Sequence, residues 1–241
     1  MELDLNESRW KALYRAGAVC AFLAFIVMVT EIFLTSLPDG SVETAGVLTI
    51  DSWFDLLQRN WFMGMRNLGL INIMATTLMI PPFLSLCALH SKDNAAWASL
   101  SLIFFITGYA IFMADNVAFP MLALSKKYAA ADSESQRMLF AAAGEALLVK
   151  GSSHTPGTFP GFFLSELASI SICFVMIKGK VFNKITGIIG VIAFLFLFIF
   201  EVCSSFITHL SDTAMIFAII GGVSAIAWYI LLGLKLAKVS K

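Results

Sequence analysis

The sequence predicts an all-α, multi-pass integral membrane protein, a bundle of six transmembrane helices with two short amphipathic helices on its outer side. Hydrophobic residues make up 59% of the 241 residues and charged residues only 13%, whereas a soluble domain carries about 25% charged residues. Six apolar runs have about the length that a helix needs to cross a bilayer, which is about 20 residues. Runs such as "IIGVIAFLFLFIF" (residues 188–200) are continuous, unlike the short alternating segments of a membrane β-barrel.

The six predicted spans form a single transmembrane domain over residues 1–241. They cover residues 16–36, 67–90, 96–118, 157–177, 185–207 and 213–234. The first run is too long for the apolar part of a signal peptide, so it is predicted to stay in the protein as a helix. Pro81 and Pro82 should kink the second span. The small residues Gly187, Gly190, Gly221 and Gly222 are expected where helices pack closely.

Two amphipathic helices are predicted in the longest connections. Over residues 49–65, Trp53, Leu57 and Trp61 recur at every fourth position, which is typical of a helix lying at a membrane interface. Over residues 133–149, Ser133 and Gln136 have the spacing of a capping box. The two helices are interpreted either as lids over the outer face or as connectors resting on lipid headgroups.

The distribution of positive charge predicts the orientation. Ten of the 16 Lys and Arg residues fall on the side that carries both termini, and cytoplasmic loops are the ones enriched in these residues. We therefore expect both termini in the cytoplasm and the protein in the plasma or inner membrane of the cell. The formal net charge is zero, which argues against a nucleic-acid partner.

Acidic residues gather in the outer half of the predicted bundle. Glu31, Asp115, Glu166 and Glu201 come from four different spans, and a charge at the centre of a membrane helix costs about 2.5–3.5 kcal/mol. The residues are therefore expected to face the bundle interior and to line a polar cavity, with Arg66 as an internal counter-charge. The predicted lining residues are Glu31, Arg66, Asn72, Asp115, Asn116, Glu166, Glu201, Ser205 and His209.

Three functions remain open for such a cavity. The first is binding of a small molecule, a cation or a lipid headgroup, for transport or sensing. The second is a membrane-embedded hydrolase that uses a divalent metal, since carboxylates and histidines are suitable ligands; the candidate ligands are Glu31, Glu166, Glu201, His154 and His209. The third is a structural role, as a homo-oligomer or a partner subunit, in which the polar residues join helices or reach headgroups. No catalytic residue can be named from the sequence.

Three stretches carry a resemblance to a known family. They are "SRWKALYRAGAVCAFLAFI" (residues 8–26), "MIPPFLSLCALH" (residues 79–90) and "FVMIKGKVFNKITGIIGVIAFLFL" (residues 174–197). Together they resemble a bacterial and archaeal family of six-helix membrane proteins that is classed as a domain of unknown function. The resemblance covers nearly the whole chain and implies six spans and cytoplasmic termini. It implies no catalytic residue.

Overall fold

The computed structural model describes residues 2–35, 37, 49–152 and 154–241, and this part of the chain is helical without a strand. Six of its helical segments are long and apolar enough to cross a membrane: Trp10–Thr35, Leu70–Leu89, Ala95–Ala129, Phe159–Lys178, Lys184–Phe206 and Thr213–Val239. The predicted fold class is confirmed. Residue 36, where the first predicted span ends, lies outside the described residues.

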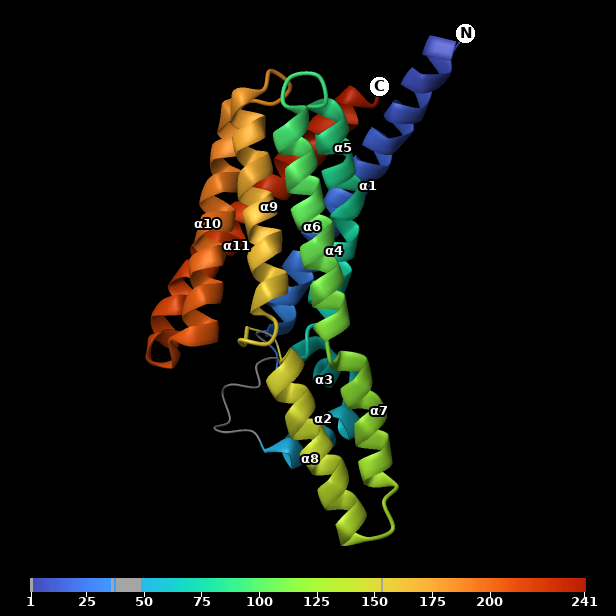
Figure 1. The fold of residues 1–241 in the computed structure, drawn as a ribbon, viewed down its shortest axis with the longest axis vertical. Helices are drawn as coiled ribbons and strands as arrows, with labels where there is room; N and C mark the ends of the chain where they lie inside the picture. Colours follow the sequence, from blue (N-terminus) through green and yellow to red (C-terminus); the bar gives the residue numbers. More distant parts are fainter. Residues whose placement is uncertain (1, 36, 38–48, 153) are drawn as a thin grey trace.

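Seven helices of the described chain make up the membrane bundle, arranged as Figure 1 shows. They are α1 (Glu2–Thr35), α4 (Leu70–Leu78), α5 (Ile80–Leu89), α6 (Ala95–Asp115), α9 (Phe159–Lys178), α10 (Lys184–Phe206) and α11 (Ser211–Val239). Both chain ends lie at one end of the bundle, which we call the terminal side. The remaining α-helices gather at the opposite end, which we call the hairpin side.

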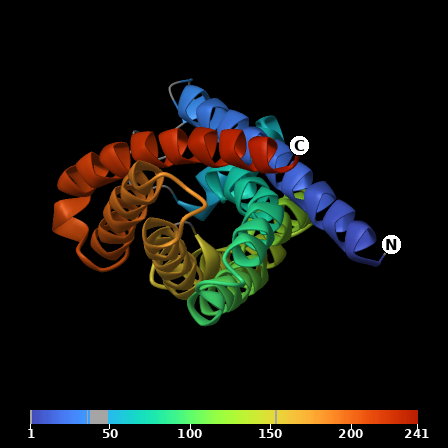
Figure 2. The same ribbon diagram turned by 90° about the horizontal axis from the view of Figure 1, so that it is seen from above.

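The bundle is a ring of helices around one core (Figure 2). Around the ring, α6 packs on α9, α9 on α10, α10 on α11, α11 on α1, α1 on α4 and α5, and α5 on α6. Every sector contributes buried side chains to the same core, including Ala21, Phe83, Phe105, Ile172 and Trp228. Burial of these residues orients each helix and therefore fixes which polar residues can meet.

A break after α4 divides the second span in two. Met79 lies between α4 and α5, and Pro81 and Pro82 follow in the first turn of α5. Proline is tolerated in the first turn because an amide hydrogen there has no partner within the helix. The span in which these two prolines were expected to cause a kink is thus interrupted at Met79, two residues before Pro81.

On the hairpin side, the predicted helix over 49–65 is two helices, α2 (Ile50–Arg59) and α3 (Trp61–Asn67). Asn60 joins them in a non-helical conformation, and its Oδ1 accepts a hydrogen bond from the Met63 amide at 3.2 Å. An asparagine that caps a helix in this way satisfies an amide that has no partner within the helix. The local capping bond therefore explains the division.

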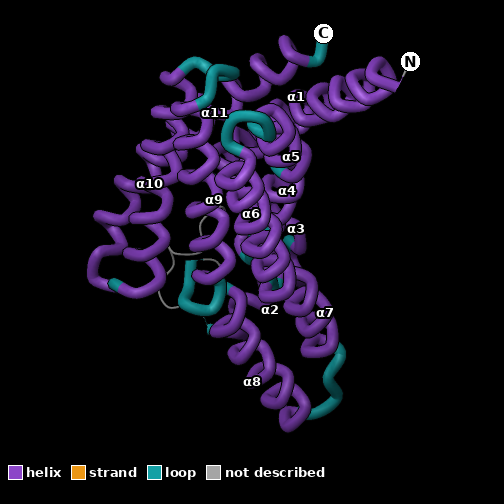
Figure 3. The backbone as a smooth tube through the Cα atoms, turned by 45° about the horizontal axis from the view of Figure 1, so that its top comes forward, coloured by secondary structure: helices purple, strands orange, loops and turns teal. Residues whose placement is uncertain are grey.

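A helix that the sequence did not predict, α7 (Ala118–Ala129), continues from the end of α6. The 21 residues of α6 already extend about 31 Å, close to the thickness of the hydrocarbon core. A bilayer whose hydrocarbon core is spanned by α6 would leave α7 outside that core. α7 forms a hairpin with α8 (Glu134–Gly151), as Figure 3 shows. The predicted capping box of α8 is present, since Ser133 Oγ accepts from the Gln136 amide at 3.3 Å.

The hairpin side has its own apolar core. It is formed by buried side chains of α2, α3 and α7 and of the residues beside them: Ile50, Trp53, Phe54, Leu57, Met65, Leu68, Val117, Ala118 and Met121. The predicted amphipathic face of residues 49–65 thus packs on α7 through Trp53 and Leu57, whereas Trp61 is exposed. The helices on the hairpin side are therefore packed against one another.

On the terminal side, His90 is buried where α5 meets the loop between α9 and α10. Its ring lies 5.9 Å from that of Phe182, and neither ring nitrogen has a hydrogen-bond partner in the described part of the chain. Burial lowers the pKa of His90 below its ordinary value of 6.5, and the nearby Asp93 carboxylate partly opposes this shift. The folded protein therefore favours the neutral imidazole.

This burial predicts a pH dependence of stability. Below pH 6.5 the unfolded chain binds a proton at His90 that the folded chain resists, so stability falls as the pH decreases through and below this value. His90→Phe keeps an aromatic ring against Phe182 and removes the titration. We expect the unfolding temperature of this variant to fall less than that of the wild type between pH 7 and pH 5. Equal decreases would contradict the prediction.

Candidate functional site

The structure distributes the four intramembrane carboxylates over three places on the hairpin side. Glu31 pairs with Arg66, Asp115 pairs with Lys150, and Glu201 pairs with His154. Glu166 interacts electrostatically with Glu201. The third place thus joins Glu201 to His154, which is 47 residues away in the chain, with Glu166 close enough to Glu201 to interact with it electrostatically.

The first place joins α1 to α3. Arg66 Nη2 lies 2.6 Å from Glu31 Oε1, and Arg66 Nε donates to Glu31 Oε2 at 3.0 Å. The guanidinium also donates to Asn67 Oδ1 at 2.7 Å and to the Thr35 hydroxyl. Such a forked ion pair is geometrically specific. Arg66, predicted as the internal counter-charge, therefore acts as the partner of Glu31.

The second place is the junction between α6 and α7. Lys150 Nζ lies 3.5 Å from Asp115 Oδ1, and Lys150 is largely exposed. Asn116, predicted as a cavity residue, is buried; its Nδ2 donates to the Leu68 carbonyl at 2.9 Å, and its Oδ1 accepts from the Ala118 amide at 3.0 Å. These bonds fix the start of α7 against the end of α3, so Asn116 has a positioning role in the hairpin.

The third place lies between α9 and α10. His154 Nδ1 is 2.6 Å from Glu201 Oε2, and Ser205 Oγ donates to Glu201 Oε1 at 3.4 Å. The Glu201 side chain is only 3% exposed, whereas that of His154 is 37% exposed. His154 therefore forms the accessible edge of this site, and Glu201 its buried part.

The backbone at His154 is held in an uncommon conformation. Its φ is 58°, in the left-handed region, which a non-glycine residue adopts only when its surroundings require it. The ring stacks on Phe162 at 5.4 Å and meets Phe200 edge-on at 4.8 Å. The loop before α9 is closed by hydrogen bonds from the hydroxyls of Thr155 and Thr158 to the Ser152 carbonyl. These contacts direct the imidazole at Glu201.

Glu166 completes the site from α9. Its side chain is half-buried, and its Oε2 is buried without a hydrogen-bond partner in the described chain. Glu166 also interacts electrostatically with the Cys173 thiol and the Tyr229 hydroxyl. It lies about 10 Å along α9 from Phe159, and Glu201 lies about 8 Å before the end of α10, so both carboxylates are at a similar depth.

The other predicted site residues lie elsewhere. His209 is exposed in a short 3₁₀ turn, Thr208–Leu210. Asn72 is half-buried in α4, and its carbonyl accepts a hydrogen bond from Thr76 at 2.7 Å. Among the residues that the structure describes, no three His, Cys, Asp or Glu side chains form a group that could hold a metal ion.

Three partners in these pairs were not predicted from the sequence. They are Lys150, which pairs with Asp115, and Thr35 and Asn67, which accept hydrogen bonds from Arg66. Arg66 and Glu31 are 35 residues apart in the chain. No local pattern reports such a contact, because it depends on how α1 and α3 are rotated about their axes.

Comparison of the chain with family models, curated proteins and solved structures finds no match. The family resemblance noted in the sequence therefore stays a prediction. The function has to be argued from the geometry of this membrane protein alone.

Proposed function

We propose that this protein is a cation-sensing integral membrane protein, in which the carboxylates of Glu166 and Glu201 share a proton or a small monovalent cation and His154 forms the accessible edge of the site. The observation that carries the proposal is the buried, unpartnered Oε2 of Glu166, a carboxylate that interacts electrostatically with the buried carboxylate of Glu201. A carboxylate removed from water needs a compensating partner. A shared proton or a bound cation satisfies that need for the pair of acids.

The surroundings of the site favour sensing over conduction. Towards the terminal side, α10 carries Thr186 as its one polar side chain between Lys184 and Glu201. Between Glu166 and Lys178, the last residue of α9, this helix offers only small hydroxyl and thiol side chains as polar groups. An ion path would need polar groups through this half of the bundle. His154, which contacts Glu201, is accessible on the hairpin side.

Glu166→Gln tests the proposal, because glutamine has nearly the shape of a protonated glutamate. The full-length protein in detergent micelles would be heated over a range of pH, and at high pH in Na⁺, K⁺ or Li⁺ salts, with choline chloride holding the ionic strength constant. We expect the wild type to match the variant when the cation is bound and to be less stable when it is absent. A ligand that binds only the folded protein stabilises it by about 2.7 kcal/mol when the free ligand concentration is about 100 times Kd.

The matched control is Glu145→Gln, which neutralises an exposed carboxylate on α8. Its response to pH and to salts should equal that of the wild type. A response to pH alone identifies the proton as the ligand, and a response to one metal salt identifies that cation. If wild type and Glu166→Gln respond identically to every condition, the proposal is overturned.

A further inference from the structure

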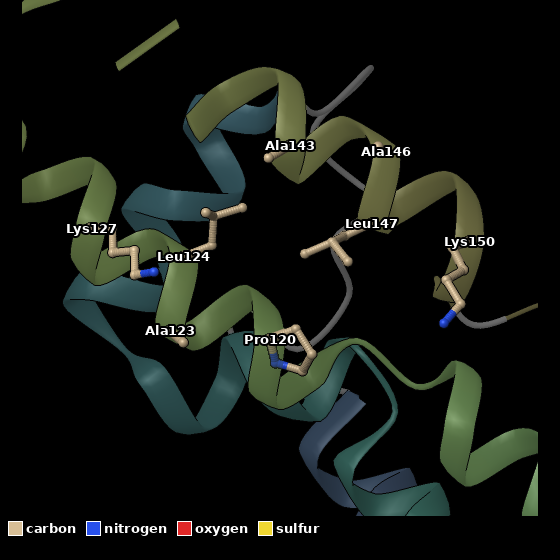
Figure 4. A pocket seen from close by; sticks show the side chains of 8 residues that line it. All are labelled: Pro120, Ala123, Leu124, Lys127, Ala143, Ala146, Leu147 and Lys150. Carbon is tan, nitrogen blue, oxygen red and sulfur yellow. The ribbon is translucent and has the colours of Figure 1, made fainter. Parts of the chain in front are cut away.

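A groove runs between α7 and α8 on the hairpin side, away from the Glu166 site (Figure 4). Its volume is about 490 Å³, within the range of small-molecule sites. Its apolar wall consists of Pro120, Ala123, Leu124, Ala143, Ala146 and Leu147. Lysines stand at its opposite ends, Lys127 at the tip of the hairpin and Lys150 where the hairpin meets the bundle.

The two lysines differ in the contacts that their ammonium groups make. Lys150 is engaged by Asp115 at 3.5 Å and by the Ala114 carbonyl at 3.3 Å. Lys127 is exposed and makes no ion pair with the described part of the chain. The groove therefore presents an available positive charge at its distal end and an apolar wall between that charge and the bundle.

The groove also starts close to the end of α6, the helix whose length matches the hydrocarbon core of a bilayer. α6 ends at Asp115, and the groove begins a few residues later, at Pro120. Beside this end, the apolar side chains of Phe119 and Val149 are 58% and 76% exposed. Exposed apolar residues at the end of a span are typical of contact with the interfacial region of a bilayer. This end of the groove is therefore the one suited to contact with lipid.

We infer that the groove binds an anionic phospholipid raised from the adjacent leaflet, with its phosphate at Lys127 and an acyl chain along the apolar wall towards the bundle. This orientation keeps the head group pointing away from the membrane, as in the bilayer itself. A lysine ammonium is a suitable partner for a phosphate. The small Ala143 and Ala146 side chains leave room for the chain against α8.

The test is retention of lipid by the full-length protein, measured by native mass spectrometry after adding phosphatidylglycerol or phosphatidylcholine with identical acyl chains. We expect the wild type to retain one phosphatidylglycerol in preference to phosphatidylcholine. Lys127→Gln should reduce that retention about tenfold, because it removes one charge-assisted contact. Ala146→Phe, which fills the groove from an exposed position, should reduce it as much.

The matched control is Lys126→Gln, since Lys126 is the exposed neighbour of Lys127 and does not line the groove. Its lipid retention should equal that of the wild type, and all three variants should unfold at the wild-type temperature. Equal losses in Lys126→Gln and Lys127→Gln would overturn the inference, as would equal retention of the two lipids. A dimer that Ala146→Phe abolishes without any lipid effect would instead assign the groove to a second copy of the chain.

Discussion

Replacing Gly108 with leucine is expected to force α6 away from α9 and to lower the free energy of unfolding by about 3 kcal/mol, the upper part of the range for overpacking. A Cβ atom at Gly108 would lie 2.8 Å from the Gly161 carbonyl oxygen and 2.9 Å from the Ser165 amide nitrogen. Both are backbone atoms, so no change of rotamer relieves the contact. Thermal unfolding in detergent micelles, followed by circular dichroism, measures the loss.

The control is Gly222→Leu on α11, where a Cβ atom would meet nothing within 4 Å. This substitution introduces the same side chain into a membrane helix without crowding a neighbour, and the unfolding temperature should stay near that of the wild type. If both variants lose the same stability, the effect comes from the leucine itself and the close approach of α6 and α9 is not the cause.

The contact between α6 and α9 also bears on the proposed site. Gly161, Ser165 and Glu166 share the first half of α9, so a shift of this half moves the Glu166 carboxylate relative to Glu201 on α10. Gly161 itself lies against Phe112 of α6, where a Cβ atom would be 3.0 Å from the Phe112 amide nitrogen. The two glycines therefore fix the position of one acid in the site by fixing its helix.

The spans could be predicted because span length and hydropathy are local properties of the sequence. α7 could not, because its sequence contains Pro120 and follows the polar pair Asp115 and Asn116, which indicate the end of a helix. In the structure, Asn116 Oδ1 accepts a hydrogen bond from the Ala118 amide at the start of the new helix, and Val117 and Met121 enter the hairpin-side core. Tertiary packing therefore determines a helix that the local pattern does not indicate.

The sequence likewise predicts some features of the candidate site and not others. The sequence places Glu31, Asp115, Glu166 and Glu201 at one end of the bundle, because depth follows from position along a span. It does not assign partners, since His154 and Glu201 are 47 residues apart and their contact depends on the loop before α9. The small residues show a similar limit: Gly187 and Gly221 lie against neighbouring helices, but Gly222 faces open space.

Removing the charge of Arg66 is the second substitution with a large expected effect. Arg66→Ala leaves Glu31 without its partner, and breaking a buried ion pair costs about 3–5 kcal/mol. The Arg66 side chain is 6% exposed and that of Glu31 is 27% exposed, so we expect about 3 kcal/mol, at the lower end of this range. Unfolding in micelles, repeated with Glu31→Gln and the double variant, gives the coupling energy between the two residues.

The control for this pair is Arg59→Ala, because Arg59 and Asp55 form an ion pair at 3.6 Å between side chains that are 55% and 77% exposed. Such surface pairs contribute about 0–1 kcal/mol. If Arg66→Ala changes stability no more than Arg59→Ala does, the Glu31 carboxylate is solvated by water or headgroups without Arg66. The ion pair then does not stabilise the contact between α1 and α3.

Arg66→Lys separates the charge of this residue from its shape. The guanidinium contacts the Glu31 carboxylate, Asn67 and Thr35 at once, and a lysine ammonium cannot reproduce that planar fork. If the pair acts as a clamp between α1 and α3, the lysine variant should recover only part of the stability lost in Arg66→Ala. Full recovery would mean that neutralising Glu31 is sufficient and that the hairpin-side end of α1 is held by its packing on α4, α5 and α11.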